Sequence, residues 1–149
     1  MKFELKKIGL SAFLLVAANV SVMAETEVCS ITTYFRDFSS KEEVSSSRFL
    51  VGKFDLKLED DEVVKRFRHE EINVSVGIAR VTNPLFKKEP VRIKLVISFM
   101  GEPGDNFDLL EGAEAESIYD KKWRWLSVSN SIKVNSRIYT FTFGCERKT

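Results

Sequence analysis

Alternation of apolar and polar residues with a period of two is the feature of this chain that most restricts its fold. In 91–100, for example, Val91, Ile93 and Leu95 alternate with Arg92 and Lys94. Successive side chains of a β-strand point to opposite faces, so this pattern predicts strands with one buried and one wetted face, as in antiparallel sheets. The pattern recurs along most of the chain, in segments 29–35, 49–59, 72–81, 91–100, 123–129, 131–135 and 137–145.

Turn-forming clusters separate these segments: "EDDE", "NPLFKKEP", "GEPGDN" and "SNS". We therefore predict an all-β fold, an antiparallel β-sandwich of about seven or eight strands with Ig-like architecture; a small β-barrel is the alternative. In 72–81, Gly77 is a candidate β-bulge. In 49–59 the expected core-facing set is Leu50, Gly52, Phe54, Leu56 and Leu58.

The first 24 residues have the features of a secretory signal peptide. "MKFELKK" is basic, "IGLSAFLLVAANVSV" carries no charge over fifteen residues, and "VMA" ends the segment. A membrane anchor is the alternative, but the apolar run is short for a span of ~20 residues. We expect cleavage after Ala24, and a product exported to the periplasm or secreted without a membrane span.

Residues 25–149 have the length of one domain. Because the leader holds three lysines and one glutamate, its removal changes the net charge from +1 to about −1. That balance argues against general nucleic-acid binding, which requires a basic surface. We expect no cofactor, and a monomer or a weak dimer.

Two cysteines remain, Cys29 and Cys145, near opposite ends of the mature chain. An even cysteine count in an exported protein predicts a disulfide. Each cysteine shares the apolar phase of its segment, with Ile31 in one and with Phe141 and Phe143 in the other, as a buried bridge requires. Closing so long a loop contributes ~4–5 kcal/mol in the chain-entropy model. A metal pair is disfavoured because two cysteines alone do not make a zinc site.

The sequence contains no recognisable catalytic set. Its single histidine, His69, lies in "KRFRHEE", which lacks the second histidine of a zinc-protease helix. We expect His69 to be a solvated residue of a charged hairpin, and we predict a protein that is not an enzyme. In the surrounding run 59–71, acids flank a basic centre, which we interpret as charge protection of an edge strand.

Residues 101–120 form the longest stretch that breaks the alternation, and they carry seven acids. Asp105 is a candidate cap of a short helix that Gly112 would end. An irregular acidic segment with apolar anchors suits a basic partner by charge complementarity. The alternative, which we slightly favour, is a solvated loop whose apolar side chains cover the end of the sandwich. The candidate partner-binding residues are Asp105, Phe107, Asp108, Leu109, Leu110 and Glu111.

Trp123 and Trp125 are two residues apart and would share one face of a strand. If Leu126 and Val128 face the core, both tryptophans face outward and form an aromatic platform for a sugar or a peptide. In the opposite phase they belong to the core, which is the more usual place for large aromatic residues and the assignment that we favour.

Three classes of function fit these features. The first is an exported inhibitor or immunity-type protein that binds a basic periplasmic hydrolase or toxin through residues 101–122. The second is a structural subunit of a surface or envelope assembly. The third is a carbohydrate-binding module that uses Trp123 and Trp125. Exposure of the tryptophans distinguishes the third class from the first.

Overall fold

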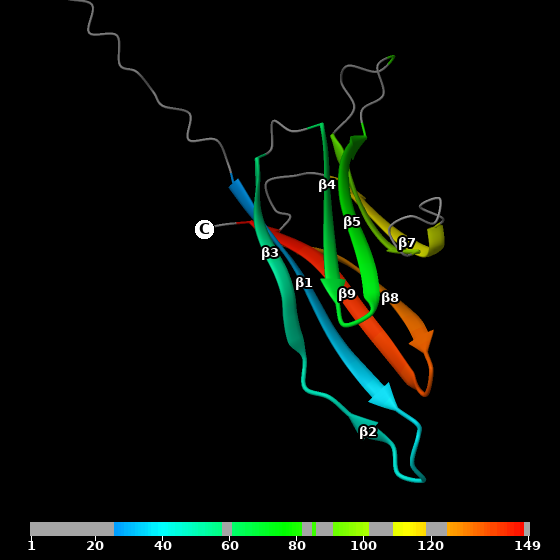
Figure 1. Cartoon of the computed structure of the whole chain (residues 1–149). Helices are drawn as coiled ribbons and strands as arrows, with labels where there is room; N and C mark the ends of the chain where they lie inside the picture. Colours follow the sequence, from blue (N-terminus) through cyan, green and yellow to red (C-terminus); the bar gives the residue numbers. More distant parts are fainter. Residues whose placement is uncertain are drawn as a thin grey trace, which may run out of the picture.

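The computed structural model describes residues 26–57, 61–81, 85, 91–101, 109–118 and 125–147. All nine regular elements in these ranges are β-strands, arranged as two antiparallel sheets that face each other (Figure 1). The predicted β-sandwich is therefore confirmed, and the sheets do not close into the alternative barrel. The strands are β1 (Thr26–Asp37), β2 (Val44–Ser45), β3 (Phe49–Lys57), β4 (Glu62–His69), β5 (Ile72–Val81), β6 (Arg92–Met100), β7 (Leu109–Ile118), β8 (Trp125–Val134) and β9 (Arg137–Arg147).

We call the two layers sheet A and sheet B. Sheet A has the order β2-β1-β9-β8, with β3 also paired to β1, and sheet B has the order β4-β5-β6-β7. The face of each sheet that looks toward the other sheet is its inner face. The core side chains of β5, β6 and β9 recur at alternate positions, so the period-two pattern of the sequence is the pattern of the core.

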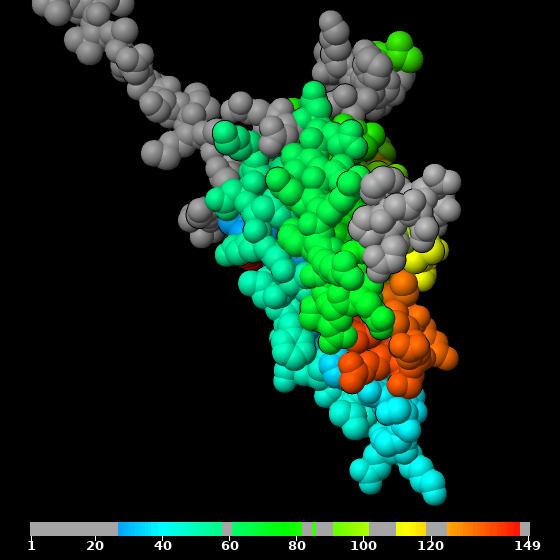
Figure 2. Space-filling model, in the orientation of Figure 1, coloured from blue at the N-terminus to red at the C-terminus, as the bar shows by residue number. Residues whose placement is uncertain are grey.

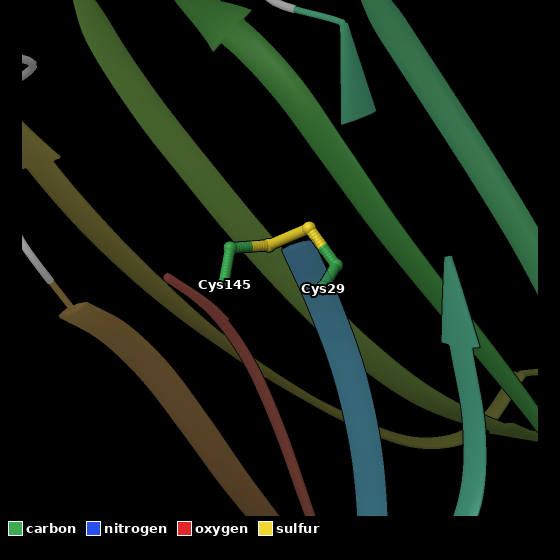
Figure 3. The surroundings of a disulfide bond; sticks show 2 residues. All are labelled: Cys29 and Cys145. Atoms are coloured by element: carbon green, nitrogen blue, oxygen red, sulfur yellow. A yellow bond between two sulfur atoms is a disulfide. The ribbon is translucent and has the colours of Figure 1, made fainter. Parts of the chain in front are cut away.

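The disulfide joins the two central strands of sheet A (Figure 3). Cys29 of β1 and Cys145 of β9 are directly opposite each other in the strand register, and both are almost completely buried. The predicted pairing of the two terminal strands is confirmed. Because the bridge lies within one sheet, it differs from the bridge between sheets that is typical of antibody domains.

Sheet A extends beyond the end of sheet B. Figure 1 shows that the β4–β5 hairpin ends part-way along β1, β8 and β9, and in Figure 2 the last part of β1 and the segment that follows it project past the green strands. We call this part the projecting end; its inner face carries Phe35, Asp37 and Arg137. Nearby, Phe38 and Phe49 are each about half exposed.

Three local predictions are wrong, each for a physical reason. A register shift at Val51 places Leu50 on the outer face of sheet A, so Leu50 is exposed. Leu58 lies outside the described residues.

Gly77 pairs with Val64 in an unbroken ladder and is not a bulge. The "SNS" segment is no turn, because Asn130 pairs with Phe141 in the middle of β8. The chain reverses instead at Asn135, which has a left-handed φ of 55°.

Residues 109–118 are also a strand and not a loop or a short helix. In β7, Ala113 and Ala115 lie opposite Ile97 and Leu95 of β6, and their small side chains pack against the core. Glu114 and Glu116 occupy the alternate, outward positions. The alternation is present, but alanine in place of large apolar residues concealed it. Residues 102–108 lie outside the described ranges, so the cap predicted at Asp105 is not described.

Candidate functional site

Trp125 begins β8 and points away from the core. Its neighbours Leu126 and Val128 face inward, which fixes the strand phase and places Trp125 on the outer face of sheet A. The side chain is 53% exposed, the opposite of the core assignment that we favoured. Trp123 lies outside the described residues.

The Trp125 indole lies over Gly144 of the neighbouring strand. A Cβ atom built on Gly144 would lie 2.9 Å from Cζ2 and 3.1 Å from Cη2 of the indole. Gly144 is buried although it is on the outer face, because the ring covers it. Glycine inside a strand often marks such a close approach, and an aromatic residue across a glycine is a known way to stabilise a strand pair. The sheet therefore holds one side of the indole and leaves the other side open to solvent.

Beyond Trp125, the outer face of β8 and β9 carries hydroxyl side chains. Ser129 Oγ and Thr142 Oγ1 are 2.9 Å apart, and so are Ser131 Oγ and Thr140 Oγ1 one row further on. Each pair joins β8 to β9 at directly opposite positions. Beside the indole, the row of Ser127, Gly144 and Ser30 has only small side chains. The result is a hydroxyl-bearing surface with one aromatic ring at its end, which we call the Trp125 face.

The predicted partner-binding residues are only partly described. Asp105, Phe107 and Asp108 lie outside the described ranges. Leu109 is the first residue of β7, and only its backbone is described. Leu110 is 61% exposed and Glu111 is exposed beside it. The structure thus places one apolar and one acidic member of the set together at the start of an edge strand.

A polar network occupies the point where sheet B ends over sheet A. Arg137 Nε donates a hydrogen bond of 2.8 Å to Asp37 Oδ2, and the Tyr139 hydroxyl donates one to Glu70. The Arg137 guanidinium also lies 4.6 Å from the centre of the Phe35 ring, in cation–π geometry. Glu70 is in the β4–β5 turn with a left-handed φ of 53°, which is uncommon for a glutamate. The network therefore ties a strained turn to sheet A.

These contacts change the protonation equilibria of the network. The hydrogen bonds from Arg137 and from the Ser39 backbone N–H hold the pKa of the Asp37 carboxyl well below its usual range. The same bond to Asp37 raises the pKa of Arg137. Burial, followed by the hydrogen bond to Glu70, raises the pKa of Tyr139. Asp37 and Arg137 are thus strongly held in their charged forms.

His69 is not the solvated residue that we expected. It is the last residue of β4, and its ring makes edge contacts with Tyr139 and Phe141, at centroid distances of 6.2 and 6.1 Å. The side chain is partly buried. We assign it a packing role at the end of the sandwich.

Two hollows lie in sheet B, with most of their lining residues on the outer face. One, of about 350 Å³, brings Arg66 and Arg68 beside Asn73 and Met100. The other, of about 180 Å³, has a floor of small residues that includes Gly77. Both belong to the layer opposite the Trp125 face.

Among the residues that the structure describes, no three histidine, cysteine, aspartate or glutamate residues are grouped so that they could hold a metal ion. The same part of the chain contains no helix with the length and apolarity that a membrane crossing needs.

Comparison with known proteins gives no relative. No family model matches the chain, and no match was found among curated proteins or solved structures. Sequence reasoning missed Gly144 and the serine and threonine rows, although the inward phase of Leu126 and Val128 was a signal that could have revealed them.

Proposed function

We propose that this is an exported protein of the periplasm or cell surface that acts by binding a carbohydrate and not by catalysis. The observation that carries the proposal is Trp125, half exposed and seated on Gly144 at the end of a hydroxyl-bearing face. The buried disulfide is compatible with an oxidising, exported environment.

The chemistry of the Trp125 face suits a sugar ring. A pyranose has an apolar C–H face that can pack on an indole, and its edge carries hydroxyl groups that form hydrogen bonds. Trp125 would supply the apolar contact, and Ser127, Ser129 and Thr142 lie on the adjoining rows for hydrogen bonding. Binding sites in general combine an apolar surface with a few well-placed polar groups.

The shape and charge of this face favour a neutral polysaccharide. The face follows the surface of a sheet, so it can contact several sugar units of an extended chain. Glu146 lies opposite Trp125 in the register and would disfavour an anionic glycan at that row. Serine and threonine carry no charge, so binding to this face should depend little on salt.

The test is retention of the protein on insoluble neutral polysaccharides such as cellulose, chitin and mannan. Trp125→Ala should abolish retention, whereas Trp125→Phe should keep part of it because an aromatic ring remains. Phe49→Ala is the matched control, since Phe49 is a comparably exposed aromatic residue that pairs with Thr33, on the inner side of sheet A. Equal retention of wild type and Trp125→Ala would refute the proposal.

Inhibition of another protein is the second candidate function, and the exposure of Leu110 beside Glu111 favours it. The partner would be a basic periplasmic hydrolase or toxin, attracted by the acids of residues 101–122. Reversing the charges of Asp105, Asp108 and Glu111 should then abolish capture of such a partner and leave the thermal midpoint nearly unchanged. Trp125→Ala should not affect capture, and this result separates the two functions.

A further inference from the structure

Sheet B ends in two edge strands of opposite charge. On β4, Arg66 and Arg68 are exposed on the outer face, and on β7 the outward residues include Glu114 and Glu116. β4 and β7 are the two ends of the strand order in the part of the chain that the structure describes. Edge strands present backbone N–H and C=O groups that can pair with another chain. Glu62 at the start of β4 is acidic, but from Val64 onward the outward charges of β4 are positive and those of β7 are negative. Over these segments two like edges repel each other and two unlike edges attract.

The strand directions allow the two edges to meet. Each neighbouring pair in β4-β5-β6-β7 is antiparallel, so β7 runs opposite to β4. If β4 of a second copy lies antiparallel beside β7, the second copy has the same orientation as the first. The sheet then continues from one molecule to the next with its alternation of strand direction unbroken.

One antiparallel register matches the side chains of both edges. When Val64 of one copy lies opposite Ile118 of the other, Arg66 falls opposite Glu116 and Arg68 opposite Glu114. All six side chains are on the outer face of sheet B. Val64 and Ile118 are 52% and 51% exposed, so this register covers two apolar side chains that are otherwise in water.

Within sheet B, β6 already pairs with the same two glutamates. Arg92 Nη1 lies 3.4 Å from Glu116 Oε1, and Lys94 Nζ lies 2.5 Å from Glu114 Oε2. Both glutamate side chains remain partly exposed. A carboxylate has about four acceptor positions, so it can accept a second cation from the far side. In the proposed register, β4 of a second copy would place its arginines against these glutamates on the side of β7 that faces away from β6.

We propose that β4 of one copy of this chain pairs antiparallel with β7 of a second copy, in the register that joins Val64 to Ile118. The contact is head-to-tail and leaves a free β4 and a free β7 at the two ends, so association is open and depends on concentration. This inference does not depend on the carbohydrate-binding proposal, because the Trp125 face belongs to the other sheet.

The experiment measures the molar mass of the exported, disulfide-bonded gene product by sedimentation over a range of concentrations. Two variants reverse one edge each: Arg66→Glu/Arg68→Glu and Glu114→Lys/Glu116→Lys. Each variant alone should associate at least about tenfold more weakly than wild type, because both of its edges then carry the same charge. An equimolar mixture should recover wild-type association, because every contact between unlike variants is complementary. Lys41→Glu/Lys133→Glu is the control: it changes the net charge by the same amount as Arg66→Glu/Arg68→Glu, but its two residues are not in sheet B. It should associate as wild type does.

A second measurement tests the register. Under oxidation, Val64→Cys/Ile118→Cys should form a ladder of disulfide-linked multimers, and Val64→Cys/Glu114→Cys should not, because its cysteines are four residues out of register. Wild type that remains monomeric at millimolar concentration would overturn the proposal. So would a mixture of the two variants that stays as weak as each alone. Association that is lost in Trp125→Ala would assign the contact to sheet A and would also refute it.

Discussion

Two glycines of sheet A lie under aromatic rings, one on each face of the sheet. On the inner face, a Cβ built on Gly52 would lie 2.1 Å from Cε1 of Phe67, which reaches across from β4 of sheet B. On the outer face, a Cβ on Gly144 would lie 2.9 Å from Cζ2 of Trp125, on the neighbouring strand of the same sheet. Both residues lack the side chain that would otherwise separate strand and ring.

The two glycine sites differ in what contacts the far side of each aromatic ring. Phe67 packs against the core and stacks with Phe54 at a centroid distance of 6.4 Å, so its contact with Gly52 holds the two sheets together. Trp125 has solvent on its far side. The same local geometry therefore serves packing in one place, and in the other it presents the surface that we propose binds carbohydrate. Variants of the two glycines should separate stability from binding.

The disulfide lies close to both glycine sites in sheet A, since Cys145 follows Gly144 in β9 and Cys29 is two residues from Ile31, the partner of Gly52. Its loss should have the largest effect. Cys145→Ser should lower the free energy of unfolding by ~2–5 kcal/mol, because it releases a closed loop between residues 116 positions apart. Chemical denaturation with and without reductant measures this effect. Because the bridge faces inward, the remaining folded protein should still bind polysaccharide. Loss of both properties together would mean that the Trp125 face depends on the bridge.

Gly52→Ala should have the next largest effect. The new methyl group would overlap the Phe67 ring, and overpacking of this kind typically costs about 1–3 kcal/mol. Adding Phe67→Leu should recover part of the loss, which a double-mutant cycle in urea would measure. Gly77→Ala is the control, because its nearest atoms would be 3.8 Å away and it should be close to neutral. A neutral Gly52→Ala would show that the Phe67 contact contributes nothing to stability.

The sequence was sufficient to predict the sandwich and the disulfide because both depend on local phase. Cys29 and Cys145 share the phase of large apolar residues, and this pattern survives without knowledge of the strand order. β7 was missed because its inward residues, Ala113 and Ala115, are too small to be distinguished from those of a polar loop. The shift that exposes Leu50 comes from a bulge, which the alternation does not reveal.

The candidate site was harder to predict than the fold. The outward direction of Trp125 follows from the phase of Leu126 and Val128, but the statistical preference of tryptophan for the core opposed it. The contact with Gly144 requires the register of β8 against β9, which the sequence does not specify. To predict the proposed pairing of β4 with β7 of a second copy, one likewise needs the strand order of sheet B, which the sequence does not specify.

Gly144→Ala should affect stability less than Gly52→Ala and binding more. The overlap is with the far end of a half-exposed side chain, which can swing aside, although the Leu126 carbonyl oxygen would also be only 3.1 Å away. We expect a loss of about 1 kcal/mol or less in the free energy of unfolding and a several-fold loss of polysaccharide affinity, because the indole is displaced. A loss of stability equal to that of Gly52→Ala would remove the distinction between the two sites.

Protonation of Asp37 in acid should have the smallest effect on stability. It should act on the inner face of sheet A, where Phe67 packs, and not on the outer face that carries Trp125. The pKa of Asp37 is lower in the folded protein than in the unfolded chain, so its contribution to stability is present above pH ~4 and is lost as the pH falls below that value. Arg137 and Glu70 connect Asp37 to the β4–β5 turn, and β4 carries Phe67. The difference in thermal midpoint between wild type and Asp37→Asn should therefore shrink between pH 7 and pH 3, while tryptophan fluorescence of the folded protein stays constant. A change of that fluorescence over the same pH range, absent in Asp37→Asn, would show that the two faces of sheet A are coupled and do not respond separately.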